Sequence, residues 1–290
     1  MPLAIAIVSP CSAVYTALCT TQPVCNLNAS IGDKTDEENL NLHGPLAGVA
    51  NTSLRPEKPM KKLILHTIAM CLMATCALGH AERVEITLSD ASTLGVYLLI
   101  PEIRSEAAFP LVILMGGGSG EEGIARDVQG GVGQDLVDRG WVVATPVSPN
   151  GRSFRGDNNR LIPLLIDALQ KDERISKGRT LLAGISNGGM SALEIAAATP
   201  QDYAGIMAVP ALVPRGLNLR ALADMPIYLR IGDQDEAGWQ DRLDETATAL
   251  RAAGAQVDAG LVFMSPHMFA MEWETLDPWL QTILPATTGN

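Results

Sequence analysis

Short apolar runs alternate with segments of helical periodicity along most of the chain, and this alternation constrains the fold more than any other feature. Strands are expected at residues 84–88, 94–100, 111–115, 141–145, 180–185, 203–209, 227–231 and 257–263. Helices are expected at residues 133–139, 161–171, 188–198, 239–253 and 271–282. Strands that alternate with helices predict βαβ units, and therefore a mostly parallel, eight-stranded sheet flanked by helices. The first two strands, which are joined by a short turn, are expected to form an antiparallel edge.

A glycine-rich segment follows the third expected strand. Residues 116–133 hold eight glycines in eighteen positions, which predicts a flexible loop next to the end of a strand. The sequence has no internal repeat and no linker-like tract beyond this point. We therefore expect residues 82–290 to form a single α/β domain.

The segment before this domain has the pattern of an export signal. Met60 and two lysines precede an apolar run at residues 63–78, and small residues lead to Ala81. This pattern predicts a secretory signal peptide at residues 60–81 that is cleaved after Ala81. Residues 1–59 are then expected to be an upstream extension, either disordered or not translated. The mature protein is expected to be secreted or periplasmic, without stable membrane association.

Two other interpretations of this leader are possible. An uncleaved anchor is one, although the apolar run is shorter than the ~20 residues that a spanning helix needs. A lipoprotein attached through Cys76 is the other, although Thr75 stands where a smaller residue is expected before the cysteine.

Charge and the placement of cysteine and histidine restrict the function. The formal net charge is −11, and no basic stripe is present, so nucleic acid is not an expected partner. Every cysteine and all but one histidine precede residue 82: Cys11, Cys19, Cys25, Cys71, Cys76, His43, His66 and His80. Residues 82–290 therefore cannot build a disulfide framework and have too few soft ligands for a His/Cys zinc site. No metal or organic cofactor is expected.

One serine in the chain stands in a G-x-S-x-G pattern. Ser186 is flanked by Gly184 and Gly188, between an expected strand and an expected helix. Parallel sheets bind ligands beyond the carboxyl ends of their strands, and small flanking residues permit the sharp turn that exposes a nucleophilic hydroxyl. The pattern alone also fits an ordinary serine in a turn. The choice depends on whether a base and an acid are placed to activate it.

The remaining sequence offers such partners. His267, the only histidine after residue 82, follows the last expected strand, where the base of a catalytic triad would lie. The preceding strand leads into Asp233 and Asp235, and the residues alone leave both open as the acid. The order serine, acid, histidine matches a known chain order for a serine that stands in a strand-turn-helix.

With these residues, the sequence resembles the α/β-hydrolase family over about residues 84–283. It looks like the compact esterase branch that includes polyhydroxybutyrate depolymerase-like and feruloyl esterase-like proteins, and it is similar to dienelactone hydrolases. The resemblance implies an acid three residues after a glycine, which selects Asp235 after Gly232. It also implies an oxyanion hole made by the backbone N–H groups of Asn187 and of the glycine segment, with Gly117 as the first candidate. Met115 stands where the family commonly has a histidine before these glycines.

The implied activity is that of an exported serine hydrolase that cleaves carboxylic esters through an acyl-enzyme. The alternatives are a peptidase or amidase of the same fold, and a catalytically inactive binding protein. Residues 210–225 are too few for a large cap, so we expect an open site and a small or exposed polymeric ester as substrate. Trp239 and Phe269 are expected either to line the substrate pocket or to pack against neighbouring helices.

Overall fold

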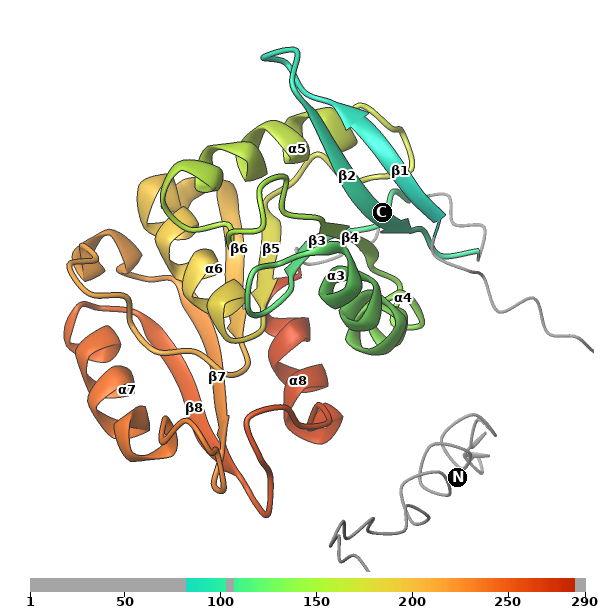
Figure 1. Ribbon diagram of the computed structural model, residues 1–290. Coiled ribbons are helices and arrows are strands. Elements are labelled where there is room, and N and C mark those ends of the chain that lie inside the picture. Colours follow the sequence, from blue (N-terminus) through green and yellow to red (C-terminus); the bar gives the residue numbers. More distant parts are fainter. Residues whose placement is uncertain (1–81, 103–106, 285–290) are drawn as a thin grey trace, which may run out of the picture. The chain divides into compact units, whose positions relative to one another are not determined.

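The structure is a computed structural model that describes residues 82–102 and 107–284. The expected leader at 60–81 and the extension at 1–59 lie outside the described residues. The described chain forms one eight-stranded sheet in the order β1-β2-β4-β3-β5-β6-β7-β8 (Figure 1). Its strands are β1 (Glu82–Thr87), β2 (Thr93–Leu99), β3 (Leu111–Met115), β4 (Val142–Pro146), β5 (Thr180–Gly184), β6 (Tyr203–Ala208), β7 (Pro226–Gly232) and β8 (Gln256–Val262).

The direction of the strands follows the prediction. β1 pairs antiparallel with β2, and β2 pairs antiparallel with β4. All the other pairings in the sheet are parallel. Every residue of β3, β4, β5 and β6 is buried, which is the pattern of parallel strands covered on both faces. At the end of the sheet, β8 is largely half-buried or exposed.

Helices cover both faces of the sheet, and side chains of alternate strand residues reach one face or the other. On one face, α5 (Leu161–Leu169), α6 (Asn187–Ala198) and α7 (Leu243–Ala252) pack over one apolar cluster. On the other, α3 (Glu122–Val128), α4 (Gln134–Val137) and α8 (Trp273–Ile283) contribute to a second cluster. Short helical turns complete the described elements: η1 (Gln129–Gly133), η2 (Gly156–Arg160), η3 (Pro200–Asp202), η4 (Leu219–Leu222) and η5 (Gln240–Arg242).

The expectation of a flexible loop over residues 116–133 is wrong for most of that segment. The chain is helical from Glu122 through Val137, with a π-helical turn in the middle. Glycine weakens a helix, but burial of one side offsets this cost. Ala125 and Gln129 are fully buried, and Gln129 Nε2 donates a hydrogen bond to the carbonyl of Val143 at 3.4 Å. Only the glycines at 116–120 lie outside the helices.

The connection between β6 and β7 is short. Within it, residues 209–225 contain one described helical turn, η4, and no further domain. The described residues therefore include no large cap, as predicted. Of the helices in the described ranges, none is long and apolar enough to cross a membrane.

Candidate active site

Ser186 lies at the junction of β5 and α6 with an unusual backbone conformation. Its φ is 55° and its ψ is −117°, a region that non-glycine residues rarely adopt and that costs about 1–3 kcal/mol. Backbone hydrogen bonds on both sides hold it there: the Ser186 N–H donates to Pro210 O at 2.8 Å, and the Met190 N–H donates to Ser186 O at 3.0 Å. The tight turn leaves the Ser186 side chain at the start of α6, at the carboxyl end of the sheet.

The two glycines of the pattern are required by close backbone contacts. A Cβ on Gly184 would lie 2.2 Å from the carbonyl carbon and oxygen of Gly188. A Cβ on Gly188 would lie 2.1 Å from the carbonyl oxygen of Met115, on the neighbouring strand β3. Both distances are far below van der Waals contact, so α6 can approach the strand ends this closely only with glycine at both positions. The spacing seen in the sequence therefore has a steric cause.

The structure brings the three residues expected to form the triad together. His267 Nε2 lies 3.0 Å from Ser186 Oγ, and His267 Nδ1 lies 2.8 Å from Asp235 Oδ2. The Asp235 side chain is fully buried, whereas 16% of the His267 side chain is exposed. The second carboxylate oxygen of Asp235 accepts a hydrogen bond from the Ala237 N–H at 2.8 Å, which fixes its orientation. The result is a continuous line of side chains from a buried carboxylate to a half-buried hydroxyl.

Asp233, the other candidate acid, has a different position. Its Oδ1 accepts a hydrogen bond from the backbone N–H of Ser265 at 3.1 Å, two residues before the histidine. The backbone of the neighbouring Gly232 also touches the histidine loop, since a Cβ at this position would lie 2.2 Å from the carbonyl oxygens of Ser265 and Pro266. The geometry therefore joins Asp235, and not Asp233, to the His267 ring, and leaves Asp233 as an anchor of the histidine loop.

A second anchor of the histidine loop is Glu236, which the sequence analysis did not single out. The backbone N–H of His267 donates to Glu236 Oε2 at 3.0 Å. The pKa of the exposed Glu236 carboxyl lies below its usual value because its own backbone N–H, and then that of His267, donate hydrogen bonds to it. The Glu236 carboxyl therefore stays ionised, and can accept this hydrogen bond as a carboxylate, down to a more acidic pH than an unperturbed glutamate. No spacing rule predicts such a contact between two loops.

The glycine segment lies against Ser186, as expected for an oxyanion hole. A Cβ on Gly117 would be 3.3 Å from the Cβ of Ser186, so this backbone passes directly over the serine. Asn187 Nδ2 donates to the Gly118 carbonyl at 2.9 Å and ties the two segments together. In the ranges that the structure describes, no residue accepts a hydrogen bond from the backbone N–H of Gly117, Gly118 or Asn187. These N–H groups are available to an added acceptor.

The two predicted pocket residues differ in their contacts. Trp239 stands edge-on to His267, with ring centroids 4.9 Å apart and an interplanar angle of 84°. It is also half-buried against the cluster under α7. Phe269 is half-buried against the cluster that contains α8. Trp239 therefore lies next to the reacting groups. Phe269 instead packs against the apolar cluster to which α8 contributes, which is the second of the two roles expected for it.

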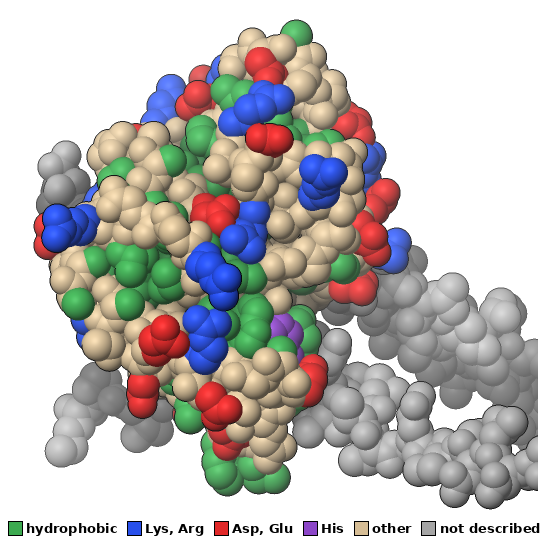
Figure 2. Space-filling view, turned by 60° about the vertical axis from the view of Figure 1, so that its left-hand side comes forward, with side chains coloured by type: hydrophobic (Ala, Val, Ile, Leu, Met, Phe, Trp, Pro, Cys, Tyr) green, Lys and Arg blue, Asp and Glu red, His purple; other side chains and the backbone are tan. Residues whose placement is uncertain are grey.

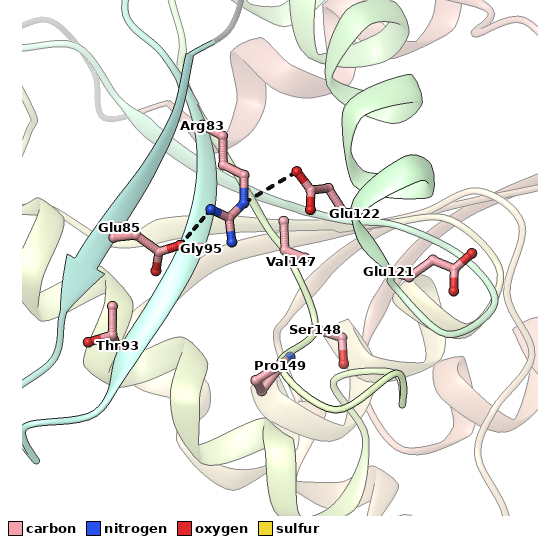
Figure 3. A pocket seen from close by; sticks show the side chains of 9 residues that line it. All are labelled: Arg83, Glu85, Thr93, Gly95, Glu121, Glu122, Val147, Ser148 and Pro149. Carbon is pink, nitrogen blue, oxygen red and sulfur yellow. Dashed lines mark ion pairs between the residues drawn. The ribbon is translucent and has the colours of Figure 1, made fainter.

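The surface has hollows away from these residues. One, of about 360 Å³, lies between the β1–β2 edge and the start of α3 (Figure 3). Within it, Arg83 is ion-paired with both Glu85 and Glu122, so its charge is already balanced. None of the residues that line this hollow belongs to the predicted triad. The candidate site is therefore defined by the hydrogen-bonded side chains of Ser186, His267 and Asp235, and not by this hollow.

Comparison with known proteins supports the fold. Residues 147–259 match the model of a family described as Phospholipase/Carboxylesterase. No curated protein matches the chain. A putative dienelactone hydrolase from Klebsiella pneumoniae is similar in structure, with a TM-score of 0.55, 20% identity, and coverage of 70% of this chain and 96% of that chain. The chain thus has the α/β-hydrolase fold that the sequence predicts.

Longer proteins share the same fold. A thermostable esterase aligns with a TM-score of 0.52 and 17% identity, over 70% of this chain and 59% of its own length. An acylaminoacyl peptidase from Pyrococcus horikoshii aligns with a TM-score of 0.53 and 13% identity, over 72% of this chain and 42% of its own. This chain therefore spans about half the length of these two proteins, and identities this low establish the fold alone.

Proposed function

We propose that the protein is a serine hydrolase that cleaves carboxylic esters, with Ser186 as nucleophile, His267 as base and Asp235 as the acid. One observation carries the proposal: His267 lies within hydrogen-bond distance of Ser186 through one ring nitrogen and of Asp235 through the other. A serine hydroxyl is a weak nucleophile until a base accepts its proton, and that base needs a fixed tautomer. The buried Asp235 carboxylate favours the tautomer with its proton on Nδ1, which leaves Nε2 free to act.

The proposed reaction has two stages. Ser186 Oγ attacks the ester carbonyl while its proton passes to His267 Nε2, and the tetrahedral intermediate collapses as the histidine protonates the leaving alkoxide. Water then attacks the acyl-enzyme with the same base and releases the carboxylic acid. Asp235 remains ionised and stabilises the imidazolium in both stages. The chain's own side chains account for every proton transfer.

The backbone N–H groups of Gly117 and Asn187 are the proposed oxyanion hole. Gly117 is the favoured donor of the glycine segment because its backbone approaches Ser186 most closely. Both groups lack an acceptor within the described residues, so they can donate to the developing negative charge without breaking another bond. Each such donor typically contributes about 10²–10³-fold in rate.

The substrate that we propose is a small or exposed polymeric ester. The absence of a large cap among the described residues 209–225 supports an open site, and Trp239 beside His267 supplies an apolar wall. The family match over residues 147–259 supports the carboxylic ester class. The fold shared with an acylaminoacyl peptidase favours amide hydrolysis as the second candidate.

A substrate panel separates these two activities. We expect turnover of p-nitrophenyl acetate and butyrate, with kcat/KM at least about 10³-fold above that for aminoacyl p-nitroanilides, a difference of about 4 kcal/mol in transition-state stabilisation. The two substrate sets share a chromophore class, so the comparison tests the scissile bond. Faster cleavage of the anilides would make the protein a peptidase or amidase, and turnover of neither set would favour the inactive binding protein.

We further propose that the protein is exported after cleavage at residues 60–81, a segment that lies outside the described residues. Edman sequencing of the protein recovered from the periplasm or medium should begin at Glu82. A first residue well before Glu82 would contradict cleavage, and recovery of the intact chain in the membrane fraction would favour the anchor interpretation.

A further inference from the structure

Three consecutive glycines, Gly116, Gly117 and Gly118, form the stretch of backbone that lies next to Ser186. A Cβ on Gly116 would lie 2.8 Å from the side chain of Ile124, and one on Gly117 would lie 3.3 Å from the Cβ of Ser186. Close packing therefore leaves little room for side chains here. Glycine backbone also adopts more conformations than that of any other residue. Without side chains to anchor it, this stretch depends on hydrogen bonds to its backbone for its position.

A tight turn ends the stretch. The Gly120 N–H donates a hydrogen bond to the Gly117 carbonyl at 2.9 Å, and the φ of Gly118 is +54°, a positive value of the kind that favours glycine in turns. The N–H of Ser148, a residue labelled in Figure 3, donates to the Gly120 carbonyl at 2.8 Å and holds the far end of the turn. The peptide between Gly118 and Ser119, in the middle of the turn, takes part in neither bond.

The side chain of Asn187 holds this middle peptide. Its Nδ2 donates a hydrogen bond to the Gly118 carbonyl at 2.9 Å. A carbonyl oxygen only accepts hydrogen bonds, so the nitrogen of the amide, and not its oxygen, faces the turn. Of the side chains in the described ranges, Asn187 alone hydrogen-bonds to the backbone of residues 116–120. One contact therefore links the middle of the turn to the residue that follows the nucleophile.

Asn187 thus belongs to both halves of the proposed oxyanion hole. Its backbone N–H is one proposed donor, and its side chain ties down the turn that carries the other, the Gly117 N–H. The contact spans 69 positions of the chain, so no local bond sets the separation of the two donors. An oxyanion hole lowers the barrier when its donors are in place before charge develops. A tie between the two donor segments therefore bears directly on the rate.

The site is open, so the fold itself has to hold the donors. Figure 2 shows a histidine side chain at the surface, with hydrophobic side chains beside it. His267 is the only histidine among the described residues, and 16% of its side chain is exposed. In enzymes with a lid, closure over the substrate can complete the catalytic groups. Residues 209–225 form a short connection here and not a cap, so closure of this kind is not available from that segment.

We propose that the Asn187 side chain is a positioning residue for ester hydrolysis, which holds the Gly117 N–H at the place where it and the Asn187 N–H reach one oxyanion. This inference rests on the proposed hydrolase function. The side chain acts through the turn, and the donors are aimed at the oxyanion and not at the carbonyl oxygen of the bound ester. Loss of the amide donor should therefore weaken binding of the transition state and leave binding of the ester nearly unchanged.

Steady-state kinetics of Asn187→Leu test this proposal. Leucine has nearly the shape of asparagine and keeps the backbone N–H, but it lacks the side-chain donor. With p-nitrophenyl butyrate, kcat should fall about 10- to 100-fold, the loss caused by a misplaced catalytic group, while KM changes less than about threefold. The pH dependence of kcat/KM should keep its wild-type shape, because the contact between Ser186 and His267 is untouched.

Two further variants separate this effect from a loss of folding. Asn187→Asp keeps the size of the side chain but cannot donate as a carboxylate, so kcat should fall at least as far as in Asn187→Leu. Gln170→Leu is the matched control: Gln170 Nε2 donates to the Gly178 carbonyl at 3.0 Å, a bond of the same kind before the amino end of β5. It should keep kcat within about threefold of wild type. Melting temperatures show whether each variant folds.

A trifluoromethyl ketone measures the oxyanion hole itself. The Ser186 oxygen bonds to the ketone carbon, its proton passes to His267, and the carbonyl electron pair becomes an oxyanion, so the affinity follows that of the transition state. In Asn187→Leu the inhibition constant should rise by about the factor by which kcat/KM falls.

An active wild type whose kcat and ketone affinity survive both Asn187→Leu and Asn187→Asp would overturn this inference alone. A lower kcat with unchanged ketone affinity would also contradict it. A wild type that neither hydrolyses the ester nor binds the ketone would overturn the hydrolase function, and this inference with it.

Discussion

Replacing Ser186 by alanine should lower ester turnover by about six orders of magnitude, the loss expected when the nucleophile of a Ser-His-Asp triad is removed. The Ser186 hydroxyl makes its hydrogen bond to His267 and is not part of the backbone contacts that hold the turn. The variant should therefore fold and melt as wild type does. The measurement is kcat for p-nitrophenyl butyrate with protein freed of contaminating esterase.

Ser191→Ala is the matched control for this prediction. Ser191 lies one turn further along α6 and donates its hydroxyl to the Asn187 carbonyl at 2.7 Å, within the helix. It contacts neither His267 nor Asp235, so its loss should change kcat less than about threefold, in keeping with a hydrogen bond worth ~1 kcal/mol or less to stability. Comparable losses in the two variants would show that packing of α6, and not the nucleophile, had been disturbed.

The second large effect concerns the acid. Asp235→Asn should lower kcat by about 10⁴-fold, because an amide beside His267 favours the wrong tautomer and cannot stabilise the imidazolium. Asp233→Asn should cost less than about tenfold, because an amide oxygen can still accept the hydrogen bond from the Ser265 N–H. Steady-state kinetics of the two variants with one ester substrate decides between them, and the reverse order of effects would exclude Asp235 as the acid.

Most of the fold follows from local sequence patterns. The apolar runs at residues 111–115 and 180–185 correspond to the buried strands β3 and β5 because burial on both faces leaves a continuous hydrophobic signal. The helix at Glu122–Val128 was not expected, since its glycines mask the periodicity of a few buried side chains such as Ala125. Its stability comes from packing on β4, which no local window contains.

The residues of the candidate site were likewise only partly predictable from the sequence. Ser186 and His267 could be predicted because the glycine spacing and the scarcity of histidine left few alternatives. Asp235 could not be separated from Asp233 by the residues alone, because both follow the same strand and only their directions in space differ. The anchoring role of Glu236 depends on a contact across 31 positions of the chain and has no sequence signal.

Covalent labelling with a fluorophosphonate probe tests the central claim most directly, since such probes react with an activated serine. We predict a single adduct per chain by intact mass, located on Ser186 by peptide mapping. His267→Ala should slow the labelling strongly, and Ser186→Ala should abolish it. A wild-type protein that does not react, or a Ser186→Ala variant that labels equally well, would contradict the account of this protein as a serine hydrolase.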